Sequence, residues 1–250
     1  MEWIDLTARW SHIAAGVIAL LVAPIAMVLR KGGASHRLWG KVYYWSMAWI
    51  FASTVILVLL RPNIFLLAVG VLSFYSAFTA VRVLRMKRPE RDRPTIVDWA
   101  GLWVALAIGS AVIIWGAVLA GGLVQREVPG GSRLAFAGLG IFFGISVVRL
   151  ALDDLRRFRS PPTEPKFWWY HHMGNMLGSY IGALTAFMVQ TVSRWMGGVE
   201  ALAPYTWVVW VLPAAIGTPL ITHWINSYRR TFAAAQPAPA DVVPLGNAPR

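Results

Sequence analysis

The sequence predicts an all-α integral membrane protein, a bundle of seven transmembrane helices with its N-terminus outside and its C-terminus in the cytoplasm. Of its 250 residues, 57% are hydrophobic and only 14% are charged, whereas a soluble domain carries about 25% charged residues. The 14 tryptophans suit the two membrane–water interfaces, where tryptophan and tyrosine concentrate. The apolar residues also fall into segments near the roughly 20 residues that a helix needs to cross a bilayer.

Seven such segments follow one another, and each is ended by turn-forming or charged residues. They cover roughly 10–29, 42–60, 64–84, 96–119, 134–152, 168–192 and 205–226. We therefore expect one transmembrane domain over residues 1–230. The Ala/Pro-rich stretch 231–250 has too few large apolar residues to build a core, so it is expected to be a disordered cytoplasmic tail.

The basic residues set the expected orientation, because cytoplasmic loops carry an excess of lysine and arginine. All but five of the 23 basic residues fall in or beside the loops that follow the first, third and fifth segments, or in the C-terminal tail. The exceptions are Arg9, Arg61, Arg126, Arg133 and Arg194. This alternation predicts a multi-pass protein of the bacterial cytoplasmic (inner) membrane, with anionic lipid headgroups as partners at its cytoplasmic face. No nucleic-acid partner is expected, since the sequence offers no soluble basic domain.

The expected topology brings four of the five histidines to one depth near the cytoplasmic face. His171 and His172 open the sixth segment, His223 lies near the inner end of the seventh, and His36 precedes the second. Asp98 opens the fourth segment on the same side. Polar groups inside a membrane are costly and usually mark a site, so we expect these side chains to form one cluster. Further polar residues expected at or near it are Arg37, Asp153, Asp154, Asn175 and Asn226.

The sixth segment also carries small residues at every fourth position: Gly174, Gly178, Gly182 and Ala186. Such a ridge lets a neighbouring helix approach closely, so we expect the histidine-bearing face of this helix to point into the bundle. Which of the two adjacent histidines faces the core stays open. The seventh segment follows after a short loop and is expected to pack beside the sixth, bringing its histidine close. A membrane partner protein or a homodimer is the alternative use of the ridge.

The stretch HRLWGKVYYW, which starts at residue 36, follows HIAAGVIALLVAPIAM and precedes a later MLGSYIGALTAFMV. Together these resemble the bacterial domain-of-unknown-function family 2306, which is marked by an HRxxGxxY motif entering a membrane helix and by a later histidine-bearing helix. His36, Arg37, Gly40 and Tyr43 match the motif, and the resemblance spans most of residues 10–190. Ala23 stands before Pro24 where the family has glycine. The resemblance implies a membrane-helical fold and no particular reaction.

Four interpretations of the expected cluster remain open. A b-type haem or another redox group would take two imidazoles from facing helices at one depth, namely His171 or His172 with His223, and His36 in reserve. A membrane hydrolase would hold a divalent metal with His172, His223 and Asp98. A small transporter or proton-coupled permease would use the same titratable groups, and a structural role would use them to anchor helix ends. We expect the redox or haem b interpretation. With no cysteine, thiolate ligands and iron–sulfur clusters are excluded.

Overall fold

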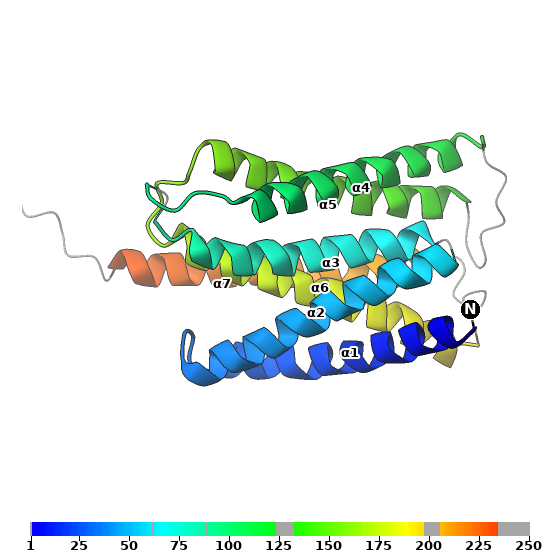
Figure 1. The fold of residues 1–250 in the computed structure, drawn as a ribbon, viewed down its shortest axis with the longest axis horizontal. Coiled ribbons are helices and arrows are strands. Elements are labelled where there is room, and N and C mark those ends of the chain that lie inside the picture. The colour runs from blue at the N-terminus through cyan, green and yellow to red at the C-terminus, as the bar shows by residue number, and fades with distance from the viewer. Residues whose placement is uncertain (1, 62, 89, 124–132, 198–205, 235–250) are drawn as a thin grey trace, which may run out of the picture.

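The computed structural model is a bundle of seven helices that lie side by side (Figure 1). It describes residues 2–61, 63–88, 90–123, 133–197 and 206–234. The helices are α1 (Glu2–Val28), α2 (Ala34–Leu60), α3 (Ile64–Arg82), α4 (Ile96–Ala120), α5 (Arg133–Arg159), α6 (Phe167–Trp195) and α7 (Thr206–Ala234), with a 3-10 turn, η1 (Val83–Arg85), after α3. The described ranges contain no strand, so the all-α prediction is confirmed. The expected tail begins inside α7, and its remainder, 235–250, lies outside the described residues.

Six of the seven helices in the described ranges are long and apolar enough to cross a membrane, and the chain is therefore a multi-pass membrane protein. The helix outside this set is α6. Its sequence explains the difference, because it carries two adjacent histidines as well as Asn175, Ser179 and Gln190. It lies between α3 and α7 and also contacts α1. The polar groups of α6 therefore have protein neighbours in the bundle, which is where membrane proteins keep such groups.

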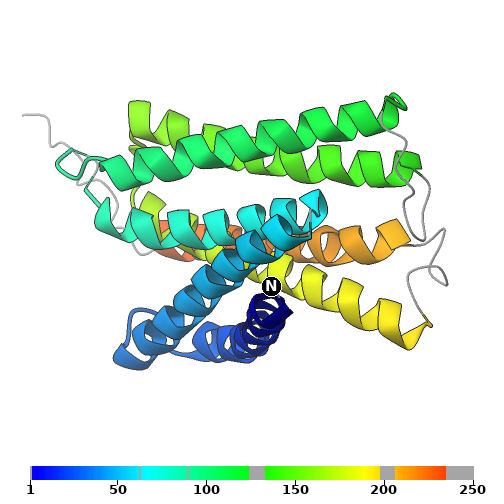
Figure 2. The same cartoon turned by 45° about the vertical axis from the view of Figure 1, so that its right-hand side comes forward.

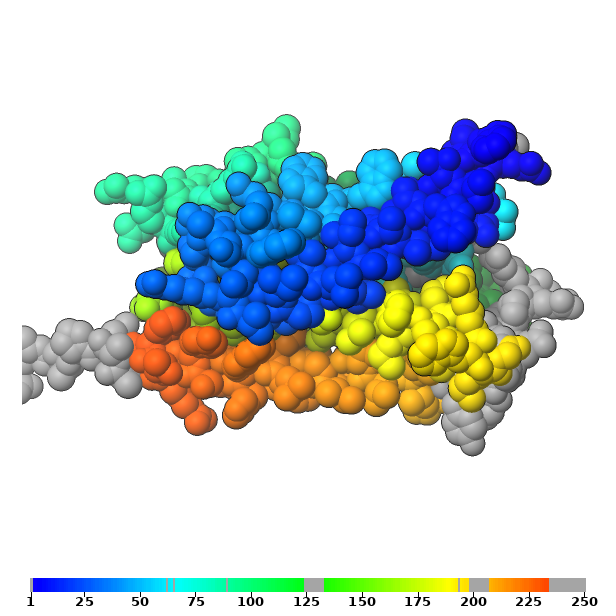
Figure 3. All heavy atoms as spheres, turned by 90° about the horizontal axis from the view of Figure 1, so that it is seen from below, coloured from blue at the N-terminus to red at the C-terminus, as the bar shows by residue number. Residues whose placement is uncertain are grey.

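The helices are arranged as two hairpins around a central pair, α3 and α6. The α1–α2 hairpin packs on one side of this pair, and the α4–α5 hairpin lies against α3 on the other side (Figures 1 and 2). Figure 3 shows α7 along α6, on the same face of the molecule as α1. Because successive helices run in opposite directions, the linkers alternate between the two ends of the bundle (Figure 1). The end that holds residues 29–33, 83–95 and 160–166 is called the histidine end below.

Small residues set the closest helix approaches. In the α4–α5 hairpin, a Cβ added at Gly116 would lie 2.9 Å from the carbonyl oxygen of Ala137, and one at Gly144 would lie 2.8 Å from that of Gly109. These distances are too short for any side chain, so the two backbones are in direct contact. In α6, a Cβ at Gly182 would overlap Ser73 of α3, whereas one at Gly178 would meet no atom within 4 Å. Part of the predicted ridge therefore seats α6 on α3, and part faces open space.

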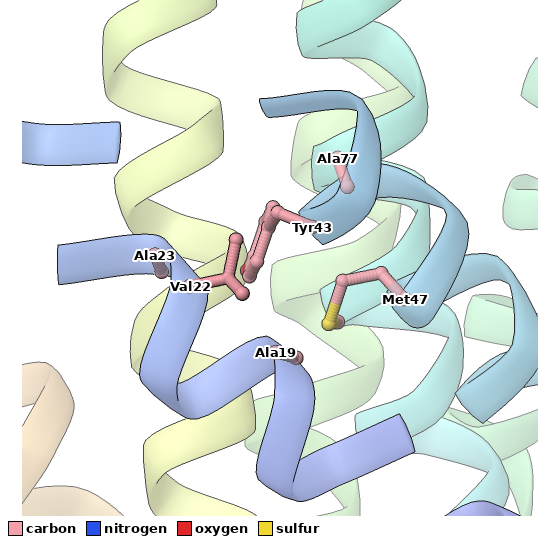
Figure 4. Packing of buried hydrophobic residues seen from close by; sticks show 6 residues of the cluster. All are labelled: Ala19, Val22, Ala23, Tyr43, Met47 and Ala77. Carbon is pink, nitrogen blue, oxygen red and sulfur yellow. The ribbon is translucent and has the colours of Figure 1, made fainter. Parts of the chain in front are cut away.

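The packing between the α1–α2 hairpin and the central pair centres on Tyr43 and Met47 of α2. Their side chains fill the space between the small residues of α1, such as Ala19, and Ala77 of α3 (Figure 4). The Tyr43 hydroxyl forms a 3.0 Å hydrogen bond with Ser179 of α6. The last residue of the HRxxGxxY motif is thus a core residue that joins α2 to α6.

Candidate functional site

His36 and His172 cap the ends of two other helices. Nδ1 of His36 lies 3.0 Å from the carbonyl oxygen of Ala26, and Nδ1 of His172 lies 2.8 Å from that of Ala80. These carbonyls lie in the last turns of α1 and α3, where backbone oxygens lack partners within the helix. A carbonyl can only accept, so each Nδ1 carries the hydrogen and donates it.

These two hydrogen bonds fix the tautomer of each imidazole. A neutral imidazole that is protonated on Nδ1 has its lone pair on Nε2. Histidines that bind metals show the same arrangement, in which the second ring nitrogen donates to a carbonyl or carboxylate and holds the ring in place. The two side chains on α2 and α6 are therefore oriented by α1 and α3, and each keeps one nitrogen available as a ligand.

The separation of the two rings also matters. Their centroids are 6.5 Å apart, with an angle of 78° between the ring planes. A metal–nitrogen bond of about 2.0–2.1 Å, added to about 1.1 Å from nitrogen to ring centroid, gives roughly 6.3 Å for two imidazoles on opposite sides of one metal, and roughly 5 Å for a tetrahedral angle. The observed separation is close to the first of these values, so His36 and His172 would be able to hold one metal ion, such as the iron of a haem, between them.

A second polar group, called the Asp154 cluster below, consists of Tyr75 and Thr79 of α3, Asp154 and Arg157 of α5, and His171 of α6. The Asp154 carboxylate accepts hydrogen bonds from the Tyr75 hydroxyl at 2.9 Å and the Thr79 hydroxyl at 2.6 Å. Arg157 Nη2 donates to it at 2.6 Å. Nε2 of His171 lies 3.1 Å from the Thr79 hydroxyl oxygen and 3.5 Å from the carboxylate. The cluster joins α3, α5 and α6 in the histidine-end half of the bundle.

The bundle itself therefore supplies hydrogen-bond donors to both carboxylate oxygens of Asp154. Asp154 is 1% exposed and Thr79 is also buried. A buried ion pair is maintained only where further hydrogen bonds satisfy its remaining atoms, and the two hydroxyls do this for the carboxylate. Sequence reasoning placed Asp154 and His171 at this depth but missed Tyr75 and Thr79. Their spacing of four residues, which puts both hydroxyls on one face of α3, was the available signal.

His223 does not meet the other histidines. On α7, Ile225 faces α6, since a Cβ added at Gly174 would lie 3.2 Å from the Ile225 Cδ1 atom. Residues two positions apart on a helix point about 200° apart, so His223 points away from α6, and its side chain is exposed in the bundle. The expected pairing of His223 with His171 or His172 is thus corrected: the helices are neighbours, but the rotation of α7 turns this histidine outward.

Asp98 belongs to a helix cap. Its carboxylate accepts two hydrogen bonds from Arg82, at 2.6 and 2.7 Å, and one from the backbone N–H of Thr95 at 2.7 Å, which completes the capping box of α4. Within the described ranges, no three histidine or acidic side chains come together as a possible metal site. The expected set of His172, His223 and Asp98 is therefore not assembled, because each contacts a different part of the molecule.

The other expected polar residues are likewise separate. Arg37 donates to the carbonyl oxygen of Gly32 at 2.7 Å, across the turn that precedes α2. The Asn175 amide donates to the carbonyl of His171 within α6 at 3.0 Å, and Asn226 is exposed on α7. The single cluster expected from depth is thus two adjacent groups: the pair His36/His172 and the Asp154 cluster.

Comparison with known proteins adds no further constraint. No protein family matches the chain, and neither a curated protein nor a solved structure matches it. The functional argument therefore rests on the geometry of these two groups.

Proposed function

We propose that the chain is a seven-span protein of the bacterial cytoplasmic membrane, related to domain-of-unknown-function family 2306, that binds a b-type haem between His36 and His172. The proposal includes α6 as the seventh span, an outside N-terminus and a cytoplasmic C-terminus. The orientation is supported by the charge distribution, because most of the basic residues flank the linkers of the histidine end. The same residues would contact anionic lipid headgroups there.

The observation that carries the haem proposal is the state of the two imidazoles. Both are held by a backbone carbonyl at Nδ1, and with their centroids 6.5 Å apart the two side chains would hold the iron of a haem between them. They come from helices far apart in sequence. A haem bound there would supply one-electron transfer, and the chain would supply the ligands and their fixed tautomers.

The surroundings of the pair also suit a haem at the edge of a membrane. Trp39 and Met176, one turn from His36 and His172 respectively, are partly buried against the packing around Tyr43 and offer apolar surface for a macrocycle. Lys31 contacts the carbonyl of Ala26 that also holds His36. Lys87 lies 4.5 Å from the centroid of the ring of Trp168, a residue one turn before His172. Both cations act electrostatically on His172, so they would supply counter-charges to the propionates of a haem held there.

A second candidate, a proton-coupled transporter, is supported by the Asp154 cluster. Ionisable groups inside a membrane bundle are costly and are functional by default, and here an aspartate, an arginine and a histidine lie together. Arg157 also borders a cavity of about 20 Å³ whose lining includes Asp92, which is room for about one water molecule. This candidate ranks second because each oxygen of Asp154 is already hydrogen-bonded. The arrangement gives a metal-dependent hydrolase no comparable support.

The optical spectrum of the purified protein tests the haem proposal. We expect a Soret band and stoichiometric iron in protein from haem-replete cells, and loss of both in His36→Ala and in His172→Ala. His223→Ala is the matched control, because this exposed histidine should leave the spectrum unchanged. A colourless, iron-free preparation would overturn the proposal, and so would a full Soret band in either ligand variant. Proton-driven uptake of a solute by liposomes containing the protein would then favour the second candidate.

A further inference from the structure

At the end of the bundle opposite the histidines, α1 and α2 form a groove. It is lined by Glu2, Trp3, Asp5, Leu6, Arg9, Leu60 and Arg61, with a volume of about 570 Å³. Ligand pockets in proteins usually measure about 300–1,000 Å³. The groove contains none of the residues used by the proposed haem site, so its occupant is a separate question.

The charges in the groove are balanced and close together. Asp5 bridges the two helices, since one of its carboxylate oxygens binds Arg9 at 2.8 Å and Arg61 at 3.0 Å. The side chains of Arg9 and Arg61 are still 48% and 70% exposed, so both guanidinium groups can bind a further anion. Glu2 is exposed beside them. Two arginines and two carboxylates give the lining no net charge, which favours a ligand carrying one charge of each sign.

The apolar part of the lining suits a lipid. Trp3 is 80% exposed and Leu6 is 47% exposed, and both lie in the first two turns of a helix that can cross a membrane. Tryptophan prefers the level of the lipid headgroups, and this level is where the end of a transmembrane hairpin must lie. Charged and apolar side chains thus lie together in one lining, which suits a ligand that carries both a headgroup and acyl chains.

We propose that this groove binds a phospholipid with a phosphoethanolamine headgroup. Arg61 and Arg9 take the phosphate, as guanidinium groups do with paired hydrogen bonds. The ammonium group lies by the exposed Glu2 carboxylate, with Asp5 as a second negative charge in the same lining. The acyl chains run along Leu6, Leu60 and Trp3. A phosphatidylglycerol molecule has the phosphate without the ammonium, so it fits the arginines but not the carboxylates.

Native mass spectrometry of the delipidated full chain, after addition of either lipid, tests this proposal. We expect about tenfold preferential retention of phosphatidylethanolamine over phosphatidylglycerol, which corresponds to about 1.4 kcal/mol. Arg61→Gln should remove most retention of both lipids. Arg194→Gln is the matched control, because Arg194 is exposed on the last turn of α6 and is not part of the groove lining. Equal retention of the two lipids, or equal losses in the two arginine variants, would overturn the proposal.

A second variant separates recognition from folding. Glu2→Gln changes an exposed side chain in the first turn of α1, so it should fold normally while it reduces the preference for phosphatidylethanolamine several-fold. An unchanged preference would contradict the role given to the carboxylates. Soluble glycerophosphoethanolamine should not displace the lipid, because it lacks the chains that the apolar residues contact. Displacement by it would overturn the assignment of a lipid.

Discussion

His171 and His172 are adjacent in sequence, yet the structure gives them opposite roles. His171 uses its Nε2 atom for the Thr79 hydroxyl and the Asp154 carboxylate. His172 uses its Nδ1 atom for a backbone carbonyl and keeps Nε2 as a lone-pair donor. Both side chains are only partly exposed, so burial does not distinguish them. The comparison teaches that the partners of each imidazole decide its role: His171 is tied into the buried Asp154 cluster, whereas His172 is held by a backbone carbonyl and lies beside His36.

Removing the charge of Asp154 should have the largest effect of the substitutions considered. Asp154→Asn leaves Arg157 buried without its counter-charge, which should lower the free energy of unfolding by about 3–5 kcal/mol. Unfolding in mixed detergent micelles, followed by circular dichroism, measures this change. Asp153→Asn is the matched control, because this neighbouring residue is exposed and pairs with Arg156 at the surface. The role of Asp154 as the counter-charge of the buried Arg157 would be disproved if the two variants unfolded alike.

The contrast between the two histidines themselves is tested by haem titration, and this prediction depends on the proposed haem site. His172→Ala should weaken haem binding by at least ~100-fold, or about 2.7 kcal/mol, because it removes a ligand. His171→Ala should leave haem affinity within a few-fold and instead lower stability by about 1–3 kcal/mol, since Asp154 and Thr79 lose a partner. The distinction between the residues fails if His171→Ala weakens binding as strongly as His172→Ala.

Much of this fold could be predicted from the sequence, because the hydropathy of a segment indicates whether it lies inside a membrane. The boundaries of α3 and α4 were expected within about two residues, which is the usual uncertainty of helix ends. α6 differs because His171, His172 and Asn175 lower its hydropathy, while its glycines and its position beside α3 keep it inside the bundle. Sequence thus identified α6 as the polar helix, but only tertiary packing shows what its polar face contacts.

The candidate site was predictable in depth and not in rotation. Topology fixes depth, so His36, His171 and His172 were correctly placed at one end of the bundle. Rotation depends on which face of a helix meets its neighbour, and α7 has apolar residues on several faces. Gly217 and Ile225, eight residues apart on one face, decide it by packing against Ile181 and Gly174 of α6. This choice turns His223 outward, and hydropathy does not encode it.

One local signal could have corrected the site from sequence. Thr95 and Asp98 have the spacing of a capping box, and this spacing indicates a helix cap at Asp98. The motif residues His36, Arg37 and Tyr43 do not act as a unit: the first caps α1, the second binds the preceding turn, and the third fills the core. The residues of one sequence motif therefore need not belong to one functional site.

Two glycines of the α6 ridge test how α6 packs on α3, which positions His171 and His172. Gly182→Ala should destabilise the protein by about 1–3 kcal/mol, because the new methyl group overlaps the Ser73 hydroxyl and would lie 3.1 Å from the Ser73 Cβ atom, so this side chain must shift. Gly178→Ala should instead be neutral or stabilising by up to about 1 kcal/mol, since alanine favours a helix and the site is open. Thermal unfolding of both variants measures the difference. Changes of the same sign would mean that α6 is seated differently.

The smallest effect is expected where α2, which carries His36, is joined to α6, which carries His172. Tyr43→Phe removes the hydroxyl that bonds to Ser179 and leaves a buried serine without that partner, which should cost about 1 kcal/mol. Tyr44→Phe is the matched control, because the Tyr44 hydroxyl makes no hydrogen bond in the described part of the chain and its ring packs equally well without it. Chemical denaturation of the two variants, with haem affinity measured alongside, gives the comparison. If the Tyr43–Ser179 hydrogen bond maintains the spacing of the His36 and His172 rings, Tyr43→Phe also weakens haem binding slightly. An effect on stability alone would mean that the helix-capping carbonyls suffice to hold the two imidazoles in place.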